Sequence, residues 1–321
     1  MSKCIAFHSY KGGTGKTTIA SNFAALLAKK GYNVFLLDLD VYAPSMQSYF
    51  KKEPKKWIND YLYSNAELDD ILLDLTPTIS EKNYDGAKNK NHANGRLWVA
   101  FSNSKKEEIY KLEGGTSGGG GAGKQDTSKI QLLRRFILLR EHLISQYDAD
   151  YIIIDTSPGI RYWSINALAV ADTLFLTLKM GDLDIEGTRK MADEIYGSFT
   201  KFGAKSYLLL NRVAGYCVPN IRDETPMVSP ATVSNDDSTL HLRNNGPSGL
   251  MQLQQEQTKK DVKNMLSDEV GMNIISAIPC YCDIQFTRKE FLTVLRYPDH
   301  PFAKQVEQLI ESMQGVLQTK V

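Results

Sequence analysis

The chain contains the stretch Lys11-Gly12-Gly13-Thr14-Gly15-Lys16-Thr17-Thr18, which follows the apolar run Cys4–Phe7 and precedes a helical pattern over Ile19–Lys30. This order of strand, glycine-rich turn and helix is typical of a loop that binds phosphate groups. Glycines allow successive backbone N–H groups to face one anion, and the N-terminus of the helix adds further donors. In this pattern we expect Lys16 to contact the β- and γ-phosphates and the Thr17 hydroxyl to bind Mg²⁺.

A second stretch, Gly118–Lys124, has the same spacing of glycine and lysine but lacks the other parts of a phosphate site. Gln125 stands where a hydroxyl would bind the metal, and no apolar strand precedes the stretch. A glycine-rich tract of this kind favours a flexible loop on the surface. We interpret residues 113–127 as an irregular loop or linker.

Composition and charge narrow the class of protein. Of the 321 residues, 42% are apolar, which suffices for a sizeable core, and the formal net charge of +1 gives no global attraction to nucleic acid or acidic membranes. Four cysteines do not suggest a disulfide framework, and a reducing cytoplasm is the simpler expectation. The first strand leaves no room for a signal peptide, and no apolar run approaches the roughly 20 residues needed to cross a bilayer. We expect a soluble, cytoplasmic protein.

Apolar runs rich in strand-forming residues alternate with helical patterns along the chain. This alternation predicts an α/β fold, namely a three-layer sandwich with a mostly parallel central sheet, of the P-loop NTPase type. We predict a single domain over residues 1–321. The predicted strands are Cys4–His8, Val34–Asp38, Leu97–Phe101, Tyr151–Asp155, Thr173–Leu178, Ser206–Leu210 and Ile274–Ile278. The predicted helices are Thr17–Lys30, Ile130–Tyr147, Ile185–Phe202 and Pro301–Leu317.

Two long polar regions interrupt this pattern. Residues 51–95 look irregular apart from a short helix around Ala66–Asp74. Residues 219–250 are rich in Pro, Ser, Asn, Asp and Thr. Loops of this length are usually functional or disordered, and neither region has enough apolar residues to form a domain. We interpret both as irregular loops or insertions.

Two of the predicted strands end in carboxylates. Asp38 and Asp40 end the run that begins at Phe35, and Asp155 ends the run Ile152–Ile154. Ligands collect at the carboxyl ends of parallel strands, so these side chains are expected at the mouth of the phosphate loop. One such aspartate commonly holds Mg²⁺ through its water shell, while another can orient an attacking water. The alternative is that each aspartate caps a neighbouring helix or loop.

Residues 11–18 resemble the deviant Walker A motif of the MinD/ParA ATPases, a family that includes the arsenite and tail-anchored-protein ATPases and the Mrp-type iron–sulfur carriers. Lys11 is the distinguishing residue. In that family the equivalent lysine acts like an arginine finger, reaching across a dimer to the phosphates bound by the other subunit. The resemblance implies an ATP hydrolase that binds ATP and Mg²⁺ and forms a homodimer when ATP is bound.

The resemblance continues along the chain and implies roles for further residues. Asp38 and Asp155 match the family's aspartates that hold the metal, and Asp40 matches the switch I residue that positions water. Asp155–Gly159 resembles the Walker B and switch II segment, in which the Gly159 N–H is expected to sense the γ-phosphate.

Matches in the second half of the chain concern the base of the nucleotide. Asn211 and Arg212 resemble the segment at a strand end that contacts adenine, and Pro279 resembles a second segment of the base pocket. These short matches leave GTP open. The resemblance runs in order from Lys3 to about Leu317 and fails mainly in the two long polar regions.

The sequence also bears on an iron–sulfur or metal carrier. Asp40–Ser45 resembles the switch I segment of the Mrp-type carriers, which place a Cys-x-x-Cys pair after the asparagine strand. Here Cys217 offers one thiolate where a bridging cluster needs two per subunit. Cys280 and Cys282 have a different spacing, which leaves open metal binding or a structural, partly buried role.

The sequence also bears on membrane binding and DNA binding. The C-terminal pattern Phe302–Leu317 has apolar residues at helical spacing but a polar face without the basic residues that bind anionic lipid, so we expect it to close the domain. Non-specific DNA binding remains a candidate. Its basic residues would be Lys51, Lys52, Lys55, Lys56, Arg288, Lys289, Arg296 and Lys304.

These observations lead to one hypothesis and two alternatives. The hypothesis is a Mg²⁺-dependent ATPase, with Lys11, Lys16 and Asp40 as catalytic residues, that switches between monomer and dimer and positions or partitions a cellular cargo. A protein cargo or activator is the expected partner. The alternatives are an ATP-dependent iron–sulfur or metal carrier and a nucleotide-binding adaptor with negligible hydrolysis.

Overall fold

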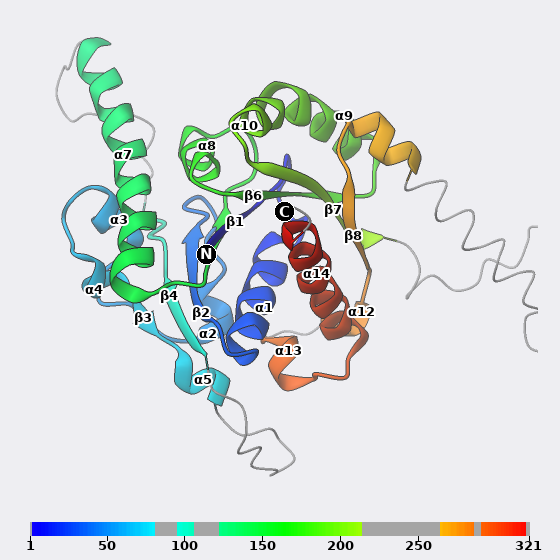
Figure 1. Cartoon of the computed structure of the whole chain (residues 1–321), viewed down its shortest axis with the longest axis horizontal. Helices are drawn as coiled ribbons and strands as arrows, with labels where there is room; N and C mark the ends of the chain where they lie inside the picture. Colours follow the sequence, from blue (N-terminus) through cyan, green and yellow to red (C-terminus); the bar gives the residue numbers. More distant parts are fainter. Residues whose placement is uncertain (1, 81–94, 106–121, 214–263, 286–289, 319–321) are drawn as a thin grey trace, which may run out of the picture.

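The computed structural model describes residues 2–80, 95–105, 122–213, 264–285 and 290–318 (Figure 1). Its strands are β1 (Lys3–His8), β2 (Asn33–Leu39), β3 (Leu73–Asp74), β4 (Arg96–Ala100), β5 (Tyr151–Thr156), β6 (Thr173–Lys179), β7 (Lys205–Val213) and β8 (Ile274–Pro279). They form one sheet in the order β3-β4-β2-β5-β1-β6-β7-β8. All neighbouring strands are parallel except β3 and β4. The predicted α/β fold with a mostly parallel sheet is confirmed.

Helices cover both faces of the sheet. The helical segments are α1 (Lys16–Lys29), α2 (Gln47–Phe50), α3 (Ile58–Leu62), α4 (Leu68–Ile71), α5 (Thr76–Ser80), α7 (Ala122–Tyr147), α8 (Tyr162–Ala169), α9 (Asp182–Met191), η1 (Ala192–Tyr196), α10 (Gly197–Lys201), α12 (Cys282–Gln285), α13 (Thr293–Arg296) and α14 (Pro301–Gln318). Figure 1 shows α1, α13 and α14 on one face, with α8, α9 and α10 on the other. Each face has its own apolar cluster.

Central strands of the sheet are buried on both faces, as their apolar sequences predict. Every residue of β5 is buried, and β1 lies between β5 and β6 with five of its six residues buried. All seven predicted strands are present, and each is longer than predicted or shifted by a residue. The two residues of β3 carry no periodic pattern, so β3 was not predicted.

The long helices also agree with the sequence, with two differences. The predicted helix Ile185–Phe202 consists of α9, the π-helical segment η1 and α10 in direct succession. The short helix α8 was not predicted. In α7, the apolar residues Phe136, Leu139 and Leu143 follow one another at helical spacing and are buried in the core.

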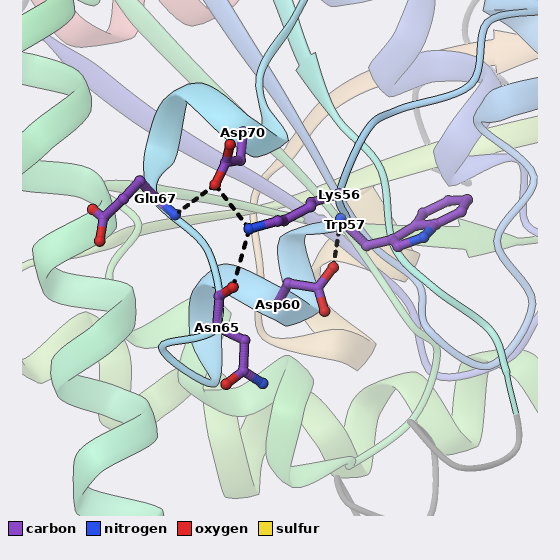
Figure 2. Close-up of polar contacts among 6 residues, drawn as sticks. All are labelled: Lys56, Trp57, Asp60, Asn65, Glu67 and Asp70. Carbon is purple, nitrogen blue, oxygen red and sulfur yellow. Dashed lines mark hydrogen bonds and ion pairs between the residues drawn. The ribbon is translucent and has the colours of Figure 1, made fainter.

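Part of the region predicted to be irregular is folded. Residues 58–80 contain α3, α4, β3 and α5, whereas 81–94 lie outside the described residues. Figure 2 shows how this segment is held: Lys56 Nζ contacts Asp70 Oδ2 at 3.0 Å and donates to the Asn65 carbonyl at 3.3 Å. Asp70 Oδ2 also accepts the Glu67 N–H at the start of α4. The apolar side chains of the segment, including Ile58, Tyr61 and Leu68, are buried in the core, so it folds by packing as well as by these surface contacts. The hydrogen bond from Lys56 lowers the pKa of Asp70.

The two other predicted loops overlap little with the described chain. In the interval 113–127, residues 113–121 lie outside it, and α7 already begins at Ala122. The second glycine-rich stretch, Gly118–Lys124, therefore ends within a helix and not in a loop. The predicted insertion 219–250 lies wholly outside the described residues.

Helix α14 closes the domain as predicted. Its apolar residues Val306, Leu309, Ile310 and Met313 are buried against the cluster that contains α1. An apolar face that is buried in the core is not available to a membrane surface. Within the described chain, no helix combines the length and the apolar character that crossing a bilayer requires.

Replacing a buried residue of α14 tests this packing. We expect Leu309→Ala to lower the free energy of unfolding by about 2–5 kcal/mol, because the leucine is fully buried and its removal leaves a cavity. Urea unfolding followed by circular dichroism measures the change. Glu311→Ala, on the exposed side of the same helix, is the matched control and should change stability by at most about 0.5 kcal/mol. Equal effects of the two substitutions would contradict the packing of α14.

Candidate functional site

The glycine-rich loop joins β1 to α1 at the carboxyl edge of the sheet. Gly13 and Gly15 have φ angles of 74° and 87°, a left-handed conformation that favours glycine. Gly15 also lies close to β7, because a Cβ atom there would come within 2.4 Å of Asn211 Nδ2. Helix α1 begins at the next residue, so its N-terminal N–H groups face the loop, as anion binding requires.

Lys16 lies inside this loop rather than on the surface. Only 5% of the residue is exposed, and its Nζ donates a hydrogen bond to Ser9 Oγ at 2.9 Å. Burial lowers the pKa of Lys16, whereas the negative charges of Asp155 and Asp40 raise it. The ammonium group is therefore bonded to a hydroxyl and influenced by the charges of two carboxylates, at the wall of a cavity of about 300 Å³.

Asp38 and Asp155 end adjacent strands and lie side by side in the register of β2 and β5. Both are buried. Burial raises the pKa of Asp155 to about 7, although nearby Lys16 and the Thr17 hydroxyl lower it. Burial, followed by the charge of Asp155, raises the pKa of Asp38 well above its usual range.

Three of the four oxygens of these two carboxylates lack hydrogen-bond partners among the described groups, namely both oxygens of Asp155 and Asp38 Oδ2. Asp38 Oδ1 accepts the Asp40 N–H at 3.0 Å. Buried carboxylate oxygens without donors, next to the hydroxyl of Thr17, fit the preference of Mg²⁺ for oxygen ligands. Asp38, Asp155 and Thr17 are thus the residues that could hold the metal, directly or through water.

Asp40 is oriented by the two strand ends that meet at the cavity. Its Oδ1 accepts a hydrogen bond from Ser157 Oγ at 2.8 Å and from the Ala43 N–H at 3.3 Å. The residue lines the cavity and is 7% exposed. A fixed carboxylate that reaches the cavity is what orientation of a water molecule requires.

Gly159 is placed differently from the expectation. Its N–H donates to the Ser9 carbonyl at 2.8 Å, so it is not directed at a phosphate in this structure. Its φ angle of 80° again favours glycine. The neighbouring Pro158, rather than Gly159, lines the cavity. Sensing of a γ-phosphate by this N–H would require the bond to Ser9 to break.

Of the three residues expected to contact the base of the nucleotide, one lines the cavity. Arg212 lines it, but Asn211 uses its Nδ2 to donate to the Thr14 carbonyl at 2.7 Å, and Pro279 at the end of β8 is not among the residues of the cavity wall. The amide nitrogen of Asn211 therefore supports the glycine-rich loop. An adenine contact of Asn211 stays a prediction.

Lys11 points away from its own cavity. Its side chain is 44% exposed, and its Nζ lies 3.0 Å from Asp184 Oδ1 of α9. The structure thus places the two lysines of the loop in different environments, with Lys16 buried beside the cavity and Lys11 at the surface.

The described cysteines do not form a metal site. Cys217 lies outside the described residues, Cys4 is buried in β1, and Cys280 is partly buried directly after β8. Over the described part of the chain, no group of three or more His, Cys, Asp and Glu side chains is arranged to hold a metal ion.

Comparison with known proteins gives the family. The family described as "CobQ/CobB/MinD/ParA nucleotide binding domain" matches residues 5–226, more than half of the chain. The chain belongs to this family. The sequence resemblance to MinD/ParA proteins is thereby confirmed.

Individual members of the CobQ/CobB/MinD/ParA family are distant relatives. The sporulation initiation inhibitor protein Soj of Bacillus subtilis is 25% identical over 204 residues, which cover 61% of this chain and 65% of Soj, less than two thirds of its length. The iron–sulfur cluster carrier protein of Aquifex aeolicus is 54% identical, but over only 46 residues, or 14% of this chain and 13% of that protein. The structure of the septum site-determining protein MinD of Pyrococcus horikoshii, complexed with Mg-ADP, covers 100% of this chain and 99% of its own, with a TM-score of 0.62 at 17% identity. The structural likeness shows a shared fold.

For this family member, the structure adds cavity residues that sequence reasoning missed. Tyr49 and Glu290 line the cavity, and the Tyr49 hydroxyl shares a hydrogen bond of 2.8 Å with the Thr18 hydroxyl. Ser9 contacts Lys16 from outside the cavity. Tyr49 and Glu290 lie far from the loop in sequence and in no recognisable pattern, so no local signal could have identified them.

The burial of Asp155 predicts a stability that depends on pH. Because its pKa is raised from 3.8 to about 7, the carboxyl destabilises the folded chain increasingly as the pH rises between these values, and constantly above them. We expect the stability of Asp155→Asn relative to the parent chain to be about 1–4 kcal/mol more favourable at pH 8 than at pH 4. Urea unfolding without metal or nucleotide measures it. The exposed Asp193→Asn is the control, and no pH dependence in Asp155→Asn would contradict this account.

Proposed function

We propose that this chain is a Mg²⁺-dependent ATPase that dimerises around ATP and positions or partitions a cellular cargo. The observation that carries the proposal is the buried Lys16 ammonium facing Asp155 and Asp40 at the end of a phosphate loop. Lys16 would bind the β- and γ-phosphates, and Asp40 would orient the water that attacks the γ-phosphate. Thr17, Asp38 and Asp155 would hold Mg²⁺, which would neutralise part of the phosphate charge.

Surface features around Lys11 support a second copy of the chain as the partner. Exposed apolar side chains follow the neighbouring strands β5, β1 and β6, at the edge where Lys11 lies. Apolar side chains that gather near a site are typical of a protein interface. In an ATP-bound homodimer this edge would carry Lys11 toward the phosphates of the partner. The exposed residues are Tyr10, Ile160, Tyr162, Met180 and Leu183.

Two lysine variants separate nucleotide binding from catalysis in trans. We expect Lys16→Ala to abolish ATP binding, because it removes the cation next to the phosphates. Lys11→Ala should bind ATP normally but lose at least about 10³-fold in kcat, the range for an arginine finger. Equilibrium binding of a fluorescent ATP analogue and phosphate release measure the two effects. Normal turnover by Lys11→Ala would reject catalysis in trans.

The size of the protein tests the switch itself. With Mg²⁺ and a non-hydrolysable ATP analogue we expect a dimer, and with ADP a monomer, because only the triphosphate offers a γ-phosphate to the partner's Lys11. Light scattering after size exclusion gives the mass in both states. Lys11→Ala is the matched control and should remain monomeric with the analogue. A mass that does not depend on the nucleotide would contradict the proposal.

One alternative has an observation in its favour. The 46-residue similarity to the iron–sulfur cluster carrier favours a metal or cluster cargo, although no described cluster of His, Cys, Asp and Glu would hold one. Anaerobic reconstitution with iron and sulfide tests it, and absence of iron and of visible absorption after purification would exclude it. Phosphate release that is lost in Asp40→Ala would exclude the non-hydrolysing adaptor. We place the protein in the cytoplasm on its cysteine content.

A further inference from the structure

Ser9 contacts three segments of the candidate site without lining its cavity. It follows β1 directly and is completely buried. Its hydroxyl lies 2.9 Å from Lys16 Nζ and 2.6 Å from the Lys11 carbonyl. Its own carbonyl accepts the Gly159 N–H at 2.8 Å. One buried residue therefore joins the two lysines of the loop and the turn after β5.

The direction of these hydrogen bonds follows from the donors. An ammonium group only donates, so Ser9 Oγ accepts from Lys16 and directs its single hydrogen to the Lys11 carbonyl. Hydrogen bonds in a chain polarise one another, so the charge of Lys16 strengthens the bond to Lys11. The ammonium has three hydrogens, of which Ser9 takes one and leaves two for phosphate oxygens.

The backbone of Ser9 is fixed from the side of β5. The Thr156 hydroxyl donates to the Phe7 carbonyl at 2.9 Å, so its contact of 2.6 Å with His8 Nδ1 is one in which the imidazole donates. Together with the bond between Ser9 and Gly159, these contacts tie the end of β1 to the end of β5. The Ser9 hydroxyl thus projects from a rigid support.

Lys11 is held by few other contacts. Its side chain is paired with Asp184, and the ring of the preceding Tyr10 lies against Gly187 of α9, where a Cβ atom would come within 2.0 Å of the ring. An exposed ion pair of this kind contributes little to stability. The bond from Ser9 to the Lys11 carbonyl is a partly buried contact that holds the backbone from which the Lys11 side chain leaves the loop.

We propose that Ser9 is a positioning residue that fixes the backbone of Lys11 relative to Lys16. The inference rests on the proposed function, in which Lys16 binds the phosphates of its own subunit and Lys11 those of the partner. Because the Ser9 hydroxyl bonds to both residues, it fixes the position of the Lys11 backbone relative to the Lys16 ammonium. The Lys11 side chain would then extend from the dimer face toward the phosphates bound by the partner subunit. Ser9 itself does not line the cavity.

Ser9→Ala, measured on the full chain with Mg²⁺-ATP, tests this role. We expect kcat to fall about 10-fold and the ATP analogue to dimerise the protein about 10-fold less tightly, since a small misplacement of a catalytic group is costly. The affinity of the monomer for the nucleotide should stay within about 3-fold, because the variant keeps Lys16, the glycine-rich loop and the nearby charges of Asp155 and Asp40. Ser9→Thr keeps the hydroxyl and should restore turnover.

A double-mutant cycle shows whether Ser9 acts through Lys11. In the Lys11→Ala background, Ser9→Ala should have no further effect on the residual turnover, because no side chain remains to be positioned. A purely structural role of Ser9 would lower turnover in both backgrounds, together with the melting temperature. Ser21→Ala is the matched control, since Ser21 is also completely buried but its hydroxyl has no hydrogen-bond partner among the described residues.

The outcomes separate this inference from the proposed function. Unchanged kcat in Ser9→Ala, or an equal loss in the Lys11→Ala background, would overturn the positioning role while leaving the ATPase intact. A loss of nucleotide affinity with unchanged dimerisation would show that Ser9 serves Lys16 alone and would also overturn it. Absence of turnover and of dimerisation in the parent chain would instead overturn the proposed function and this inference together.

Discussion

The site depends on the positive charge of the buried Lys16 ammonium, which offsets the negative charges of Asp155 and Asp40. The register of β2 and β5 places Asp38 beside Asp155. Two buried carboxylates on neighbouring strands repel each other when both are charged. Lys16 supplies the positive charge on the protein side of the cavity. The glycine-rich loop makes this arrangement possible, because only a tight turn returns the lysine toward the strand ends from which the loop began.

Features set by local sequence were predictable. Apolar runs gave the seven longer strands, the glycine pattern gave the loop, and the rule that ligands gather at the carboxyl ends of parallel strands brought Asp38, Asp40 and Asp155 together. The short helix α8 escaped prediction because its apolar residues show no clear helical period. Within residues 58–80 the predicted short helix around Ala66–Asp74 corresponds to α4, whereas α3, β3 and α5 escaped prediction because elements of five residues or fewer show no clear period.

Contacts between distant parts of the chain could not be predicted in this way. The Gly159 N–H bonds to Ser9, and the Asn211 amide supports Thr14, although a family pattern had suggested nucleotide contacts for both. Each of these two N–H groups lies near the glycine-rich loop and donates its hydrogen bond to a backbone carbonyl. A sequence pattern can bring a polar group to a site, whereas its partner is decided by three-dimensional packing.

The short strand β3 has a consequence for how copies of this chain can associate. A parallel sheet of this kind would otherwise present the bare backbone of β4 at its edge, where another chain could add a strand. The antiparallel pairing of Leu73 and Asp74 with β4, followed at once by α5, covers part of that edge. Open-ended aggregation through this side of the sheet is thereby disfavoured, which matters for a molecule proposed to pair reversibly through a different surface.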